Sequence, residues 1–468
     1  MAKNLIPYTK AYPGDTETPI TIYRKLAGDG IGILLESCEQ PKGRYSFIAT
    51  DPMAVLRAKG NRVVIERKGA LSIHEGRILD IAGKFMSEFQ VKNTTEIPFT
   101  GGLVGTVGYD IIRQYEKLPD TKMDELGLPD VHLLAITELI AYDHFYHRII
   151  FIVLAEESNE GKQYAKKRLE EMKDVLERTV GIPDSIHEKT LHRIEVQSNM
   201  SCQEFMRMVE KAKRYICEGD IFQVVLSQRW KLTTDQKPFT LYRKLRQVNP
   251  SAYMFYMNFG DYQVTGSSPE LLTEVRKNKV FTCPIAGTRR RGKNEEEDII
   301  LAKELLADEK EQAEHVMLVD LGRNDMGKIS SFGSVNVKKF MEVKYYSHVM
   351  HLVSLVEGER RGELDMFSVL SSFLPAGTLS GAPKIRAMEI IEELEPAKRG
   401  IYGGAAGYFG FNGDMDMCIA IRTMIIRDGK VYLQAGAGIV ADSVPENEFE
   451  ETVNKIKALV RAVEGDQQ

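Results

Sequence analysis

Acidic side chains recur at helical spacing in the segment that ends DEKEQAEHVMLVDLGRND (308–325). At roughly 100° per residue in a helix predicted over 295–318, four chemically active side chains share one face: Glu304, Glu311, Glu314 and His315. Apolar side chains fall on the same side of that helix: Ile300, Ala307 and Leu318. A half-buried carboxylate needs a counter-charge, and no Lys or Arg follows Glu311 within one turn on that face. The segment therefore predicts a metal or substrate site.

A second acidic helix is predicted at 446–463. Its Glu448 and Glu451, three residues apart, can point at a shared ligand. Carboxylates from two helices suit Mg²⁺, which takes few protein oxygens, keeps waters and often bridges to an anionic substrate. An acidic surface on a terminal helix is the alternative, and the combination with the first helix favours the metal.

The segment GTLSGAPKIRAMEII (377–391) has the features of an anion-binding site. A Gly-Ser loop leads into a helix predicted over 382–394, whose first N–H groups and positive dipole end attract a carboxylate or phosphate. Lys384 and Arg386 would add charge. The loop lacks the Walker A pattern, so nucleotide binding is not supported. Plain helix capping is the alternative.

Two further segments could hold an anion. In QAGAGIV (434–440), Gly436 and Gly438 could expose backbone N–H groups after a strand, although a tight turn is an equal alternative. Arg422 stands alone in the otherwise apolar strand predicted over 417–426, and a buried Arg usually has a carboxylate partner.

Histidines and nucleophile motifs give weaker signals. His348 and His351 lie in an apolar stretch, where a core role is the commoner one for a histidine. The patterns G-x-S-x-G and HExxH and the dinucleotide fingerprint are missing, which disfavours hydrolase and dehydrogenase chemistry.

Composition limits the class of protein. With 468 residues, 43% hydrophobic and 28% charged, the chain can bury a large core. A net charge of -5 gives no field for nucleic acid. No apolar run approaches the ~20 residues of a membrane span, and five scattered cysteines without a CxxC fit a reducing cytosol. We expect a cytoplasmic protein whose partners are small molecules or proteins.

The chain divides into a strand-rich region at 1–190 and a mixed α and β region at 200–468, with a polar connecting segment at 179–200. The stretches GGLVGTVGYD (101–110) and GGAAGYFGFNGD (403–414) share a glycine pattern. Glycines at such spacing let another backbone approach closely, so two similar, tightly packed strands are expected.

Five motifs together resemble the chorismate-utilising enzymes: PIAGTRRRG (284–292), DEKEQAEHVMLVDLGRND, GTLSGAPK (377–384), RGIYGGAAGY (399–408) and QAGAGIVADSVPENEFEET (434–452). The resemblance implies an α+β fold of four α/β/β/α layers, with two large antiparallel sheets packed face to face and helices outside. It also implies that the chain binds chorismate with Mg²⁺.

Single residues select among the reactions of that family. The water-adding members carry a basic Lys where this chain has Gln223, and an amide cannot act as a base. Aminodeoxychorismate synthases typically carry Lys where this chain has Ala286, so their covalent adduct is lost. The resemblance then favours the anthranilate synthase activity of a large subunit, a lyase that forms anthranilate and pyruvate from chorismate and ammonia.

The resemblance also implies a feedback site. LLES (34–37) is similar to one half of the tryptophan site of such enzymes, and NPSAYM (249–254) to the other, although Ala252 stands where many relatives have Pro. The residues expected to contact tryptophan are Ser37, Ala252, Tyr253 and Met254. Tryptophan would then inhibit the first committed step of its own synthesis.

The remaining site residues are implied in the same way. Mg²⁺ would be held by Glu314 and Glu451, supported by Glu311 and Glu448. The expected substrate-binding residues are Gly287, Thr288, Tyr402, Arg422, Gly436, Ala437 and Gly438. The expected catalytic residues are Glu270 as an acid, with His351 assisted by Thr378 in the elimination.

A separate glutamine amidotransferase subunit is expected to supply ammonia, because no Cys has a nucleophile-elbow context. Two alternatives stay open: an aminodeoxychorismate synthase component I, and a non-catalytic protein that binds tryptophan.

Overall fold

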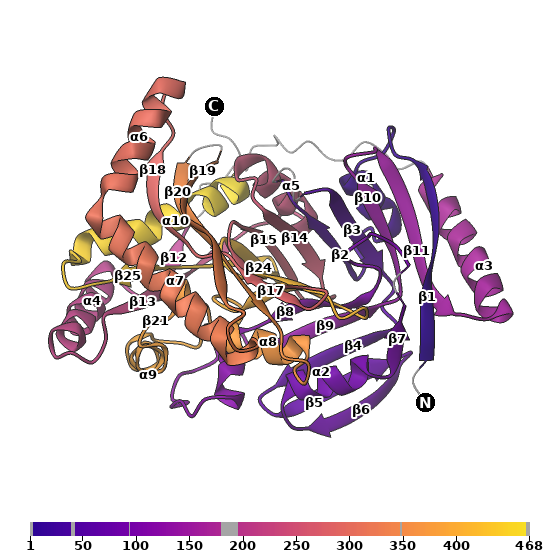
Figure 1. Ribbon diagram of the computed structural model, residues 1–468, viewed down its shortest axis with the longest axis horizontal. Helices are drawn as coiled ribbons and strands as arrows, with labels where there is room; N and C mark the ends of the chain where they lie inside the picture. The colour runs from indigo at the N-terminus through magenta and orange to yellow at the C-terminus, as the bar shows by residue number, and fades with distance from the viewer. Residues whose placement is uncertain (1–2, 39–42, 93, 179–194, 347–348, 465–468) are drawn as a thin grey trace.

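The computed structural model describes residues 3–38, 43–92, 94–178, 195–346 and 349–464. Two large sheets dominate it (Figure 1). The described part of the first sheet has 13 strands in the order β12-β13-β25-β24-β15-β14-β2-β3-β10-β11-β1-β7, with β21 beside β13. The described part of the second has 12, in the order β18-β20-β17-β16-β23-β22-β8-β9-β4-β5-β6, with β19 beside β20. The parallel pair β1–β7 is an exception to the antiparallel pairing, which runs through pairs such as β2–β14 and β8–β22.

The strands of the first sheet are β1 (Lys3–Pro13), β2 (Gly32–Glu36), β3 (Tyr45–Thr50), β7 (Phe89–Val91), β10 (Glu138–Asp143), β11 (Arg148–Glu156), β12 (Gln197–Ser198), β13 (Gln223–Thr233), β14 (Tyr253–Asn258), β15 (Gln263–Ser268), β21 (Gly381–Ala382), β24 (Thr423–Arg427) and β25 (Lys430–Ile439). Those of the second are β4 (Ala54–Lys59), β5 (Arg62–Arg67), β6 (Ala70–Glu75), β8 (Gly102–Val107), β9 (Val131–Ile136), β16 (Leu271–Arg276), β17 (Lys279–Thr282), β18 (Ile285–Arg290), β19 (Asn336–Tyr345), β20 (Val349–Glu359), β22 (Ala405–Gly410) and β23 (Met415–Ile419). The helices are α1 (Pro19–Leu26), α2 (Ile78–Met86), α3 (Asn159–Leu176), α4 (Cys202–Cys217), α5 (Pro238–Val248), α6 (Glu295–Ala307), α7 (Glu309–Ile329), α8 (Met366–Phe373), α9 (Lys384–Leu394) and α10 (Pro445–Glu464), with short 3-10 helices at Tyr109–Gln114 and Gly377–Leu379.

The layers follow from which faces of the sheets are apolar. Side chains from both sheets form one core between them, including Ile33 and Phe47 of the first and Val104 and Leu134 of the second. The outer face of the first sheet packs against α1, α3, α5 and α10. The outer face of the second packs against α2, α7 and α8. The predicted α+β fold with four α/β/β/α layers is confirmed.

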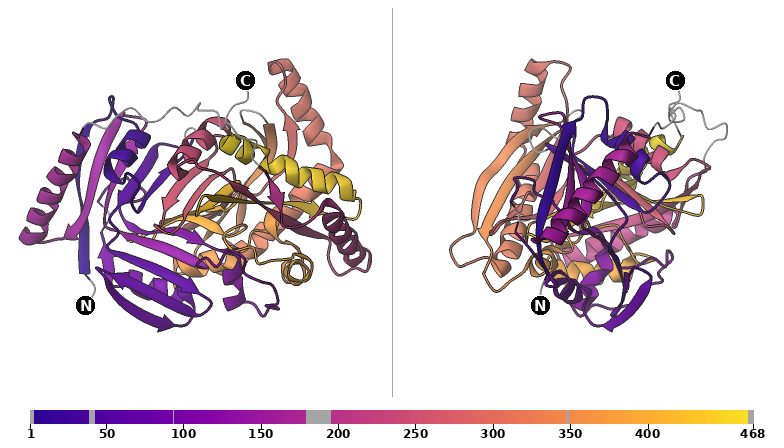
Figure 2. Two further views of the ribbon diagram at one scale, coloured as in Figure 1. Left: turned by 180° about the vertical axis from the view of Figure 1, so that it is seen from behind. Right: turned by 90° about the vertical axis from the view of Figure 1, so that its right-hand side faces the viewer.

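Both sheets contain strands from the two regions that the sequence distinguishes. In the first sheet β2 pairs with β14, and in the second β8 pairs with β22. Figure 1 and the left view of Figure 2 show β1 (indigo) and α3 at one end of the long axis, and α4, α6 and the yellow start of α10 at the other. Most of the connecting segment predicted at 179–200 lies outside the described residues, which exclude 179–194.

The two glycine-rich stretches are the strands that join the regions in the second sheet. Gly105 of β8 lies opposite Gly407 of β22. A Cβ atom on Gly105 would come within 2.0 Å of the carbonyl oxygen of His132, and one on Gly407 within 2.0 Å of that of Asp416. The expected tight packing is confirmed, and it explains why side chains are missing there.

The helix predicted over 295–318 is wrong as a single element. It ends at Ala307, and a new helix, α7, begins at Glu309. Asp308 separates them because its side chain accepts hydrogen bonds from the N–H groups of Lys310 and Glu311, which caps α7. Glu304 therefore belongs to α6 and does not share a helix face with Glu311 and Glu314.

Two predicted strand boundaries also need correction. The strand predicted over 417–426 is broken between β23 and β24, and Arg422 lies in the break with a φ of 50°. The stretch 434–440, read as a loop or tight turn, continues β25 as far as Ile439. No helix among the described residues has the length and apolar character needed to cross a membrane.

Candidate functional site

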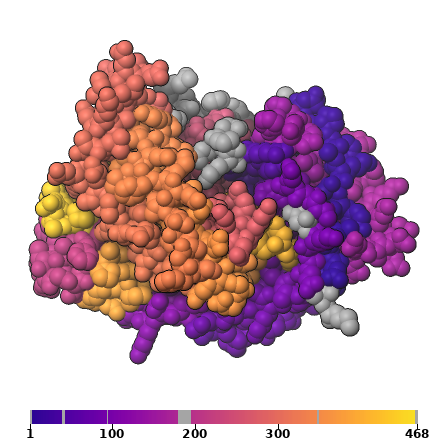
Figure 3. Space-filling model, viewed as in Figure 1, coloured from indigo at the N-terminus to yellow at the C-terminus, as the bar shows by residue number. Residues whose placement is uncertain are grey.

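Charge interactions link Glu314 of α7 with Glu311 and with Glu451 of α10, and Glu451 with Glu448, at the end of the molecule where yellow α10 emerges beside α6 and α7 (Figure 3). Burial raises the pKa of Glu314, and the nearby charges of Glu311 and Glu451 raise it further. Burial and Glu451 likewise raise the pKa of Glu448, against a hydrogen bond from Ser443 that lowers it. The structure thus brings together the four acids that the sequence proposed for Mg²⁺.

Two of these acids already have cationic partners. Arg289 of β18 donates to Glu311 at 3.0 Å, and Lys455 lies 2.6 Å from Glu451. The helix face itself supplies no Lys or Arg after Glu311, and the structure provides a cation from a neighbouring strand instead. Sequence spacing along one helix could not reveal Arg289, whereas the i,i+4 pair of Glu451 and Lys455 was visible.

Glu314 makes no hydrogen bond or ion pair with any part of the chain that the structure describes. No three His, Cys, Asp or Glu side chains of the described residues are arranged closely enough to be recognised as a metal site. A half-buried carboxylate repelled by its neighbours nevertheless fits a hard cation, and Mg²⁺ usually takes only one or two protein carboxylates. The donor set at Glu314 and Glu451 is therefore compatible with Mg²⁺.

Glu270 lies in the turn that joins β15 of the first sheet to β16 of the second. Its Oε2 accepts a hydrogen bond from Thr378 Oγ1 at 3.0 Å. Burial raises the pKa of Glu270, and Thr378, Lys455 and Arg422 only partly oppose this. Glu270 and Thr378 line a cavity of about 50 Å³ together with residues of α7, including Leu318. A protonated carboxyl group beside a cavity can act as a general acid.

Thr378 is expected to assist His351, but the hydrogen bond that its Oγ1 donates goes to Glu270. Instead, His351 Nδ1 lies 3.0 Å from the carbonyl oxygen of Gly287 and 3.0 Å from Thr288 Oγ1. A carbonyl can only accept, so Nδ1 carries the proton and Nε2 keeps its lone pair. Burial lowers the pKa of His351, and the charge of Arg422 adds to this. The neutral ring is thus prepared to take a proton at Nε2.

A bulge in β18 places the Gly287 carbonyl. The register of β18 with β20 shifts between Ala286 and Thr288, and Gly287 adopts a φ of 66°. A Cβ atom there would lie 3.1 Å from Leu305 and 3.2 Å from Glu311. The backbone conformation therefore favours glycine, and a Cβ atom would also push these neighbours by a few tenths of an ångström.

Arg422 is a largely buried cation without a carboxylate in direct contact. Its Nη1 donates to the carbonyl oxygen of Lys455 at 2.6 Å, and no ion pair with another described residue is formed. Burial lowers its pKa, against the charges of Glu270, Tyr402 and Glu451. The carboxylate partner expected from the sequence is absent from the described chain, which leaves the guanidinium available to an anionic ligand.

Lys455, whose carbonyl accepts from Arg422, also contacts the glycines of β25. Lys455 Nζ donates to the carbonyl oxygen of Gly436 at 2.8 Å. A Cβ atom on Gly436 would lie 3.1 Å from Tyr402 Oη, and one on Gly438 would lie 2.5 Å from Gln223 Nε2. From Gln434 onward β25 pairs only with β13 in the described chain, because its partner β24 ends opposite Leu433. The backbone from Gly436 through Ala437 to Gly438 therefore has no strand partner on its second edge in the described chain, and only the Gly436 carbonyl is engaged by Lys455.

Gln223 begins β13 and is 5% exposed. Its Oε1 is buried without a hydrogen-bond partner among the described residues. A buried acceptor left unpaired is costly, so a ligand donor is expected there.

The anion site predicted at the start of α9 is not available as such. Lys384 Nζ donates to Asp325 Oδ2 at 2.5 Å, and Arg386 pairs with Asp220 and Glu389. Both cations are thus already neutralised by the protein. Of the predicted histidines, His348 lies outside the described residues, and His315 is buried in the core with Nε2 at 2.6 Å from Ser354 Oγ.

The two segments expected to bind tryptophan are neighbours. Met254 of β14 lies opposite Glu36 of β2, which places Ser37 beside Ala252 and Tyr253. The Cys38 N–H donates to the Ser251 carbonyl at 3.1 Å. Tyr253 Oη donates to Asp416 of β23 at 3.0 Å, so its hydroxyl is engaged with the second sheet.

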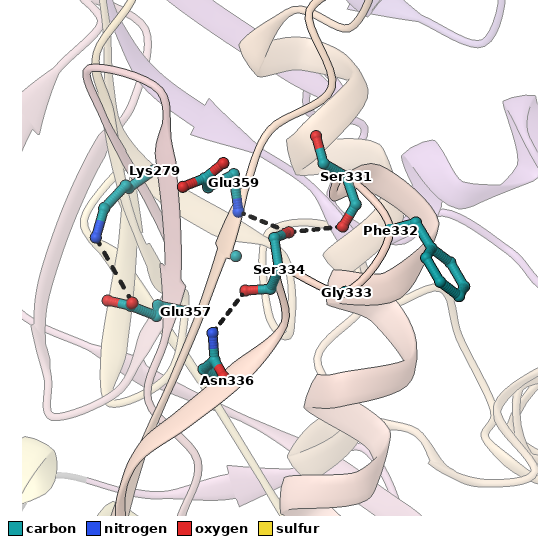
Figure 4. Close-up of a pocket in the computed structure, with 9 residues that line it drawn as sticks. Lys279, Ser331, Phe332, Gly333, Ser334, Asn336, Glu357 and Glu359 are labelled. Atoms are coloured by element: carbon teal, nitrogen blue, oxygen red, sulfur yellow. Dashed lines mark hydrogen bonds and ion pairs between the residues drawn. The ribbon is translucent and has the colours of Figure 1, made fainter.

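A larger surface pocket of about 360 Å³ lies elsewhere, at the turn between α7 and β19 (Figure 4). Ser334 Oγ accepts from the N–H of Glu359 and donates to the carbonyl oxygen of Ser331 at 2.7 Å. Lys279 of β17 points to Glu357 of the neighbouring strand β20, on one side of the pocket. None of the residues predicted for chemistry lines it, and its polar groups serve the turn itself.

The sequence pattern of the family described as chorismate binding enzyme matches residues 33–461. The chain belongs to this family. Its relatives include proteins named anthranilate synthase component 1. That of Acetivibrio thermocellus is 50% identical over 477 residues, which cover 99% of this chain and 97% of the relative. That of Neisseria meningitidis serogroup B is 45% identical over 98% of this chain and 95% of the relative.

Solved structures agree with the fold. The crystal structure of anthranilate synthase component I from Streptococcus pneumoniae superposes with a TM-score of 0.80 at 42% identity, covering 90% of this chain and 93% of that one. The menaquinone-specific isochorismate synthase of Escherichia coli reaches a TM-score of 0.75 at 20% identity, over 99% of this chain and 95% of that one. The second likeness concerns the fold alone.

Proposed function

We propose that this chain is the chorismate-converting component of an anthranilate synthase, a lyase that turns chorismate and ammonia into anthranilate, pyruvate and water. Two separate observations carry the proposal. Arg422 is a desolvated cation without a carboxylate contact, and Glu314 is a carboxylate without a cation contact. Chorismate has two carboxylates. One can bind Arg422 directly, and the other can reach the acidic cluster through a divalent cation.

Substrate positioning follows from this assignment. Arg422, Tyr402 and the backbone of Gly436–Gly438 bind the enolpyruvyl carboxylate. Gly287 and Thr288 lie beside the ring. Glu314 and Glu451 would hold Mg²⁺, with Glu311 and Glu448 in support. Mg²⁺ bound there would neutralise the ring carboxylate and withdraw electron density from the ring.

Two proton transfers are assigned to this chain's own residues. Glu270 gives its proton to the 4-hydroxyl group, which leaves as water while the ammonia nitrogen bonds to C2. The new ammonium group gives up one proton, which restores Glu270. His351 Nε2 then takes the proton from C2 as the bond from C3 to the enolpyruvyl oxygen breaks, so the ring becomes aromatic and enolpyruvate leaves. A proton delivered to the methylene carbon of enolpyruvate gives pyruvate. The buried Oε1 of Gln223 can accept an N–H of the incoming ammonia.

Similarity along the full chain supports this reaction over the other members of the family, because the named relatives are anthranilate synthase components. Ammonia is supplied by a glutamine amidotransferase subunit, and the complex works in the cytoplasm. Tryptophan binds at Ser37, Ala252, Tyr253 and Met254 and inhibits the enzyme, since these residues meet at the β2–β14 pair.

The test compares nitrogen sources with the purified chain. With chorismate, Mg²⁺ and ammonium chloride, we expect fluorescent anthranilate, whereas glutamine should serve only after the amidotransferase subunit is added. A 4-amino product without pyruvate would select the aminodeoxychorismate synthase alternative. Tryptophan binding in a calorimeter without turnover under any of these conditions would select the non-catalytic alternative.

A further inference from the structure

Arg399 is the largest of the fully buried side chains, and the reaction described above leaves it without a role. It lies between α9 and β22 and is 2% exposed. Its Nε and Nη2 donate to the two carboxylate oxygens of Glu395 at 2.9 and 2.5 Å. The charge is thus compensated inside the protein, and a buried pair of this kind is by itself weak evidence for a stabilising role.

The other contacts of Arg399 go to backbone that carries site residues. Nη1 donates to the carbonyl oxygen of Leu379 at 2.5 Å, directly after Thr378. Nη2 donates to the carbonyl oxygen of Val225 at 2.8 Å, and Val225 lies opposite Gly438 in the β13–β25 pair. One planar group therefore fixes the short 3-10 helix of Thr378 against β13, the strand that pairs with the glycines of β25.

Aromatic contacts complete the setting. The guanidinium carbon lies 4.7 Å from the ring centre of Tyr109 and 5.7 Å from that of Tyr402. Glu395 in turn accepts from the N–H and Oγ of Ser227, both at 2.8 Å. Arginine alone offers a rigid fork of donors between two rings, and the compact ammonium of Lys cannot reach the same acceptors together.

We propose that Arg399 is a positioning residue that sets the hydrogen bond from Thr378 to Glu270, and through it the protonation of the leaving hydroxyl. The inference rests on the roles proposed above for Glu270 and Thr378. Arg399 holds the Leu379 carbonyl, so the Thr378 hydroxyl has one place relative to the Glu270 carboxyl. Loss of the fork lets the 3-10 helix shift, and a shift of about 1 Å can cost a hundredfold in rate.

A double-mutant cycle on kcat tests the inference, with Arg399→Lys, Thr378→Val and the double variant of the otherwise intact chain. We expect each single variant to lose about tenfold to a hundredfold in kcat with KM for chorismate within about twofold, and the double variant to be no slower than the slower single one. Arg113→Lys is the matched control, because Arg113 pairs with buried Asp110 and Glu392 but holds no backbone of the site. It should keep kcat.

Two results would overturn the inference on its own: full kcat in folded Arg399→Lys, or losses that multiply in the double variant. Full kcat in Thr378→Val would instead overturn the proposed role of Thr378, and the inference with it. Should Arg399→Lys fail to fold, the isosteric Glu395→Gln, which loosens the same guanidinium, replaces it in the cycle with the same outcomes.

Discussion

Replacing Glu314 by Gln separates the effect on metal binding from the effect on stability. The Glu314 carboxylate is repelled by neighbouring carboxylates and makes no hydrogen bond or ion pair with the described residues. Its pKa is raised by burial and by the like charges of Glu311 and Glu451. Each like-charge neighbour on a partly exposed helix costs about 0.2–0.5 kcal/mol. Without Mg²⁺, Glu314→Gln should therefore raise the free energy of unfolding by about 0.5–1 kcal/mol, which is the reverse of what removing a structural side chain does.

Mg²⁺ binding should move in the opposite direction. Loss of an outer partner of a metal ligand typically costs 10–100-fold in affinity, so loss of a ligating carboxylate should cost at least about a hundredfold. Calorimetric titration with MgCl₂ and thermal melting with and without the metal measure the two effects. Glu304→Gln is the control, because the break at Asp308 puts this exposed acid on α6, away from the cluster.

The reasoning about the acidic cluster fails on either of two results. One is Mg²⁺ binding by Glu314→Gln with unchanged affinity. The other is a lower melting temperature of this variant in the absence of metal, since that would reveal a stabilising contact of the carboxylate.

Three further predictions concern the substrate side of the site. Gly287→Ala should cost about 1–2 kcal/mol of stability, measured by denaturation, because its φ of 66° strains any residue with a Cβ; unchanged stability would contradict the role of the bulge. Arg422→Gln should raise KM for chorismate by about 10–150-fold, the loss of one or two charge-assisted hydrogen bonds, while the exposed Arg427→Gln should not; equal effects would remove Arg422 from the site. Thr378→Val should move the alkaline limb of the kcat/KM profile to higher pH. The hydrogen bond from Thr378 lowers the pKa of Glu270, so its removal raises that pKa, and the acid stays protonated to higher pH. A shift to lower pH would show that Glu270 is not that acid.

Much of the fold could be predicted because local pattern and tertiary setting agree. The run at 253–258 is short and almost wholly apolar and lies between Pro250 and Gly260, which predicts a buried strand, and the structure has it at Tyr253–Asn258. The spacing of Ser201 and Glu204 is that of a capping box, which predicts a helix start, and α4 begins there with both reciprocal hydrogen bonds present. The last helix, predicted over 446–463, extends one residue further at each end.

The errors arose where a local signal competed with periodicity or where the contact is distant. Asp308, three residues before Glu311, is itself a capping pattern, but the helical period on both sides concealed it. Arg422 lies where the chain passes from β23 of the second sheet to β24 of the first, and the apolar pattern on both sides concealed this crossing. The bond from Thr378 to Glu270 joins residues 108 positions apart, and no spacing rule reaches that far.

The reaction itself is tested most directly by product stoichiometry. The purified chain is incubated with chorismate, Mg²⁺ and ¹⁵N-labelled ammonium, and anthranilate and pyruvate are quantified by mass spectrometry and a coupled lactate dehydrogenase assay. We expect ¹⁵N-labelled anthranilate and pyruvate in equal amounts, both suppressed by tryptophan. Isochorismate, or an aminated product that retains the enolpyruvyl group at the end of the reaction, would contradict the proposed function.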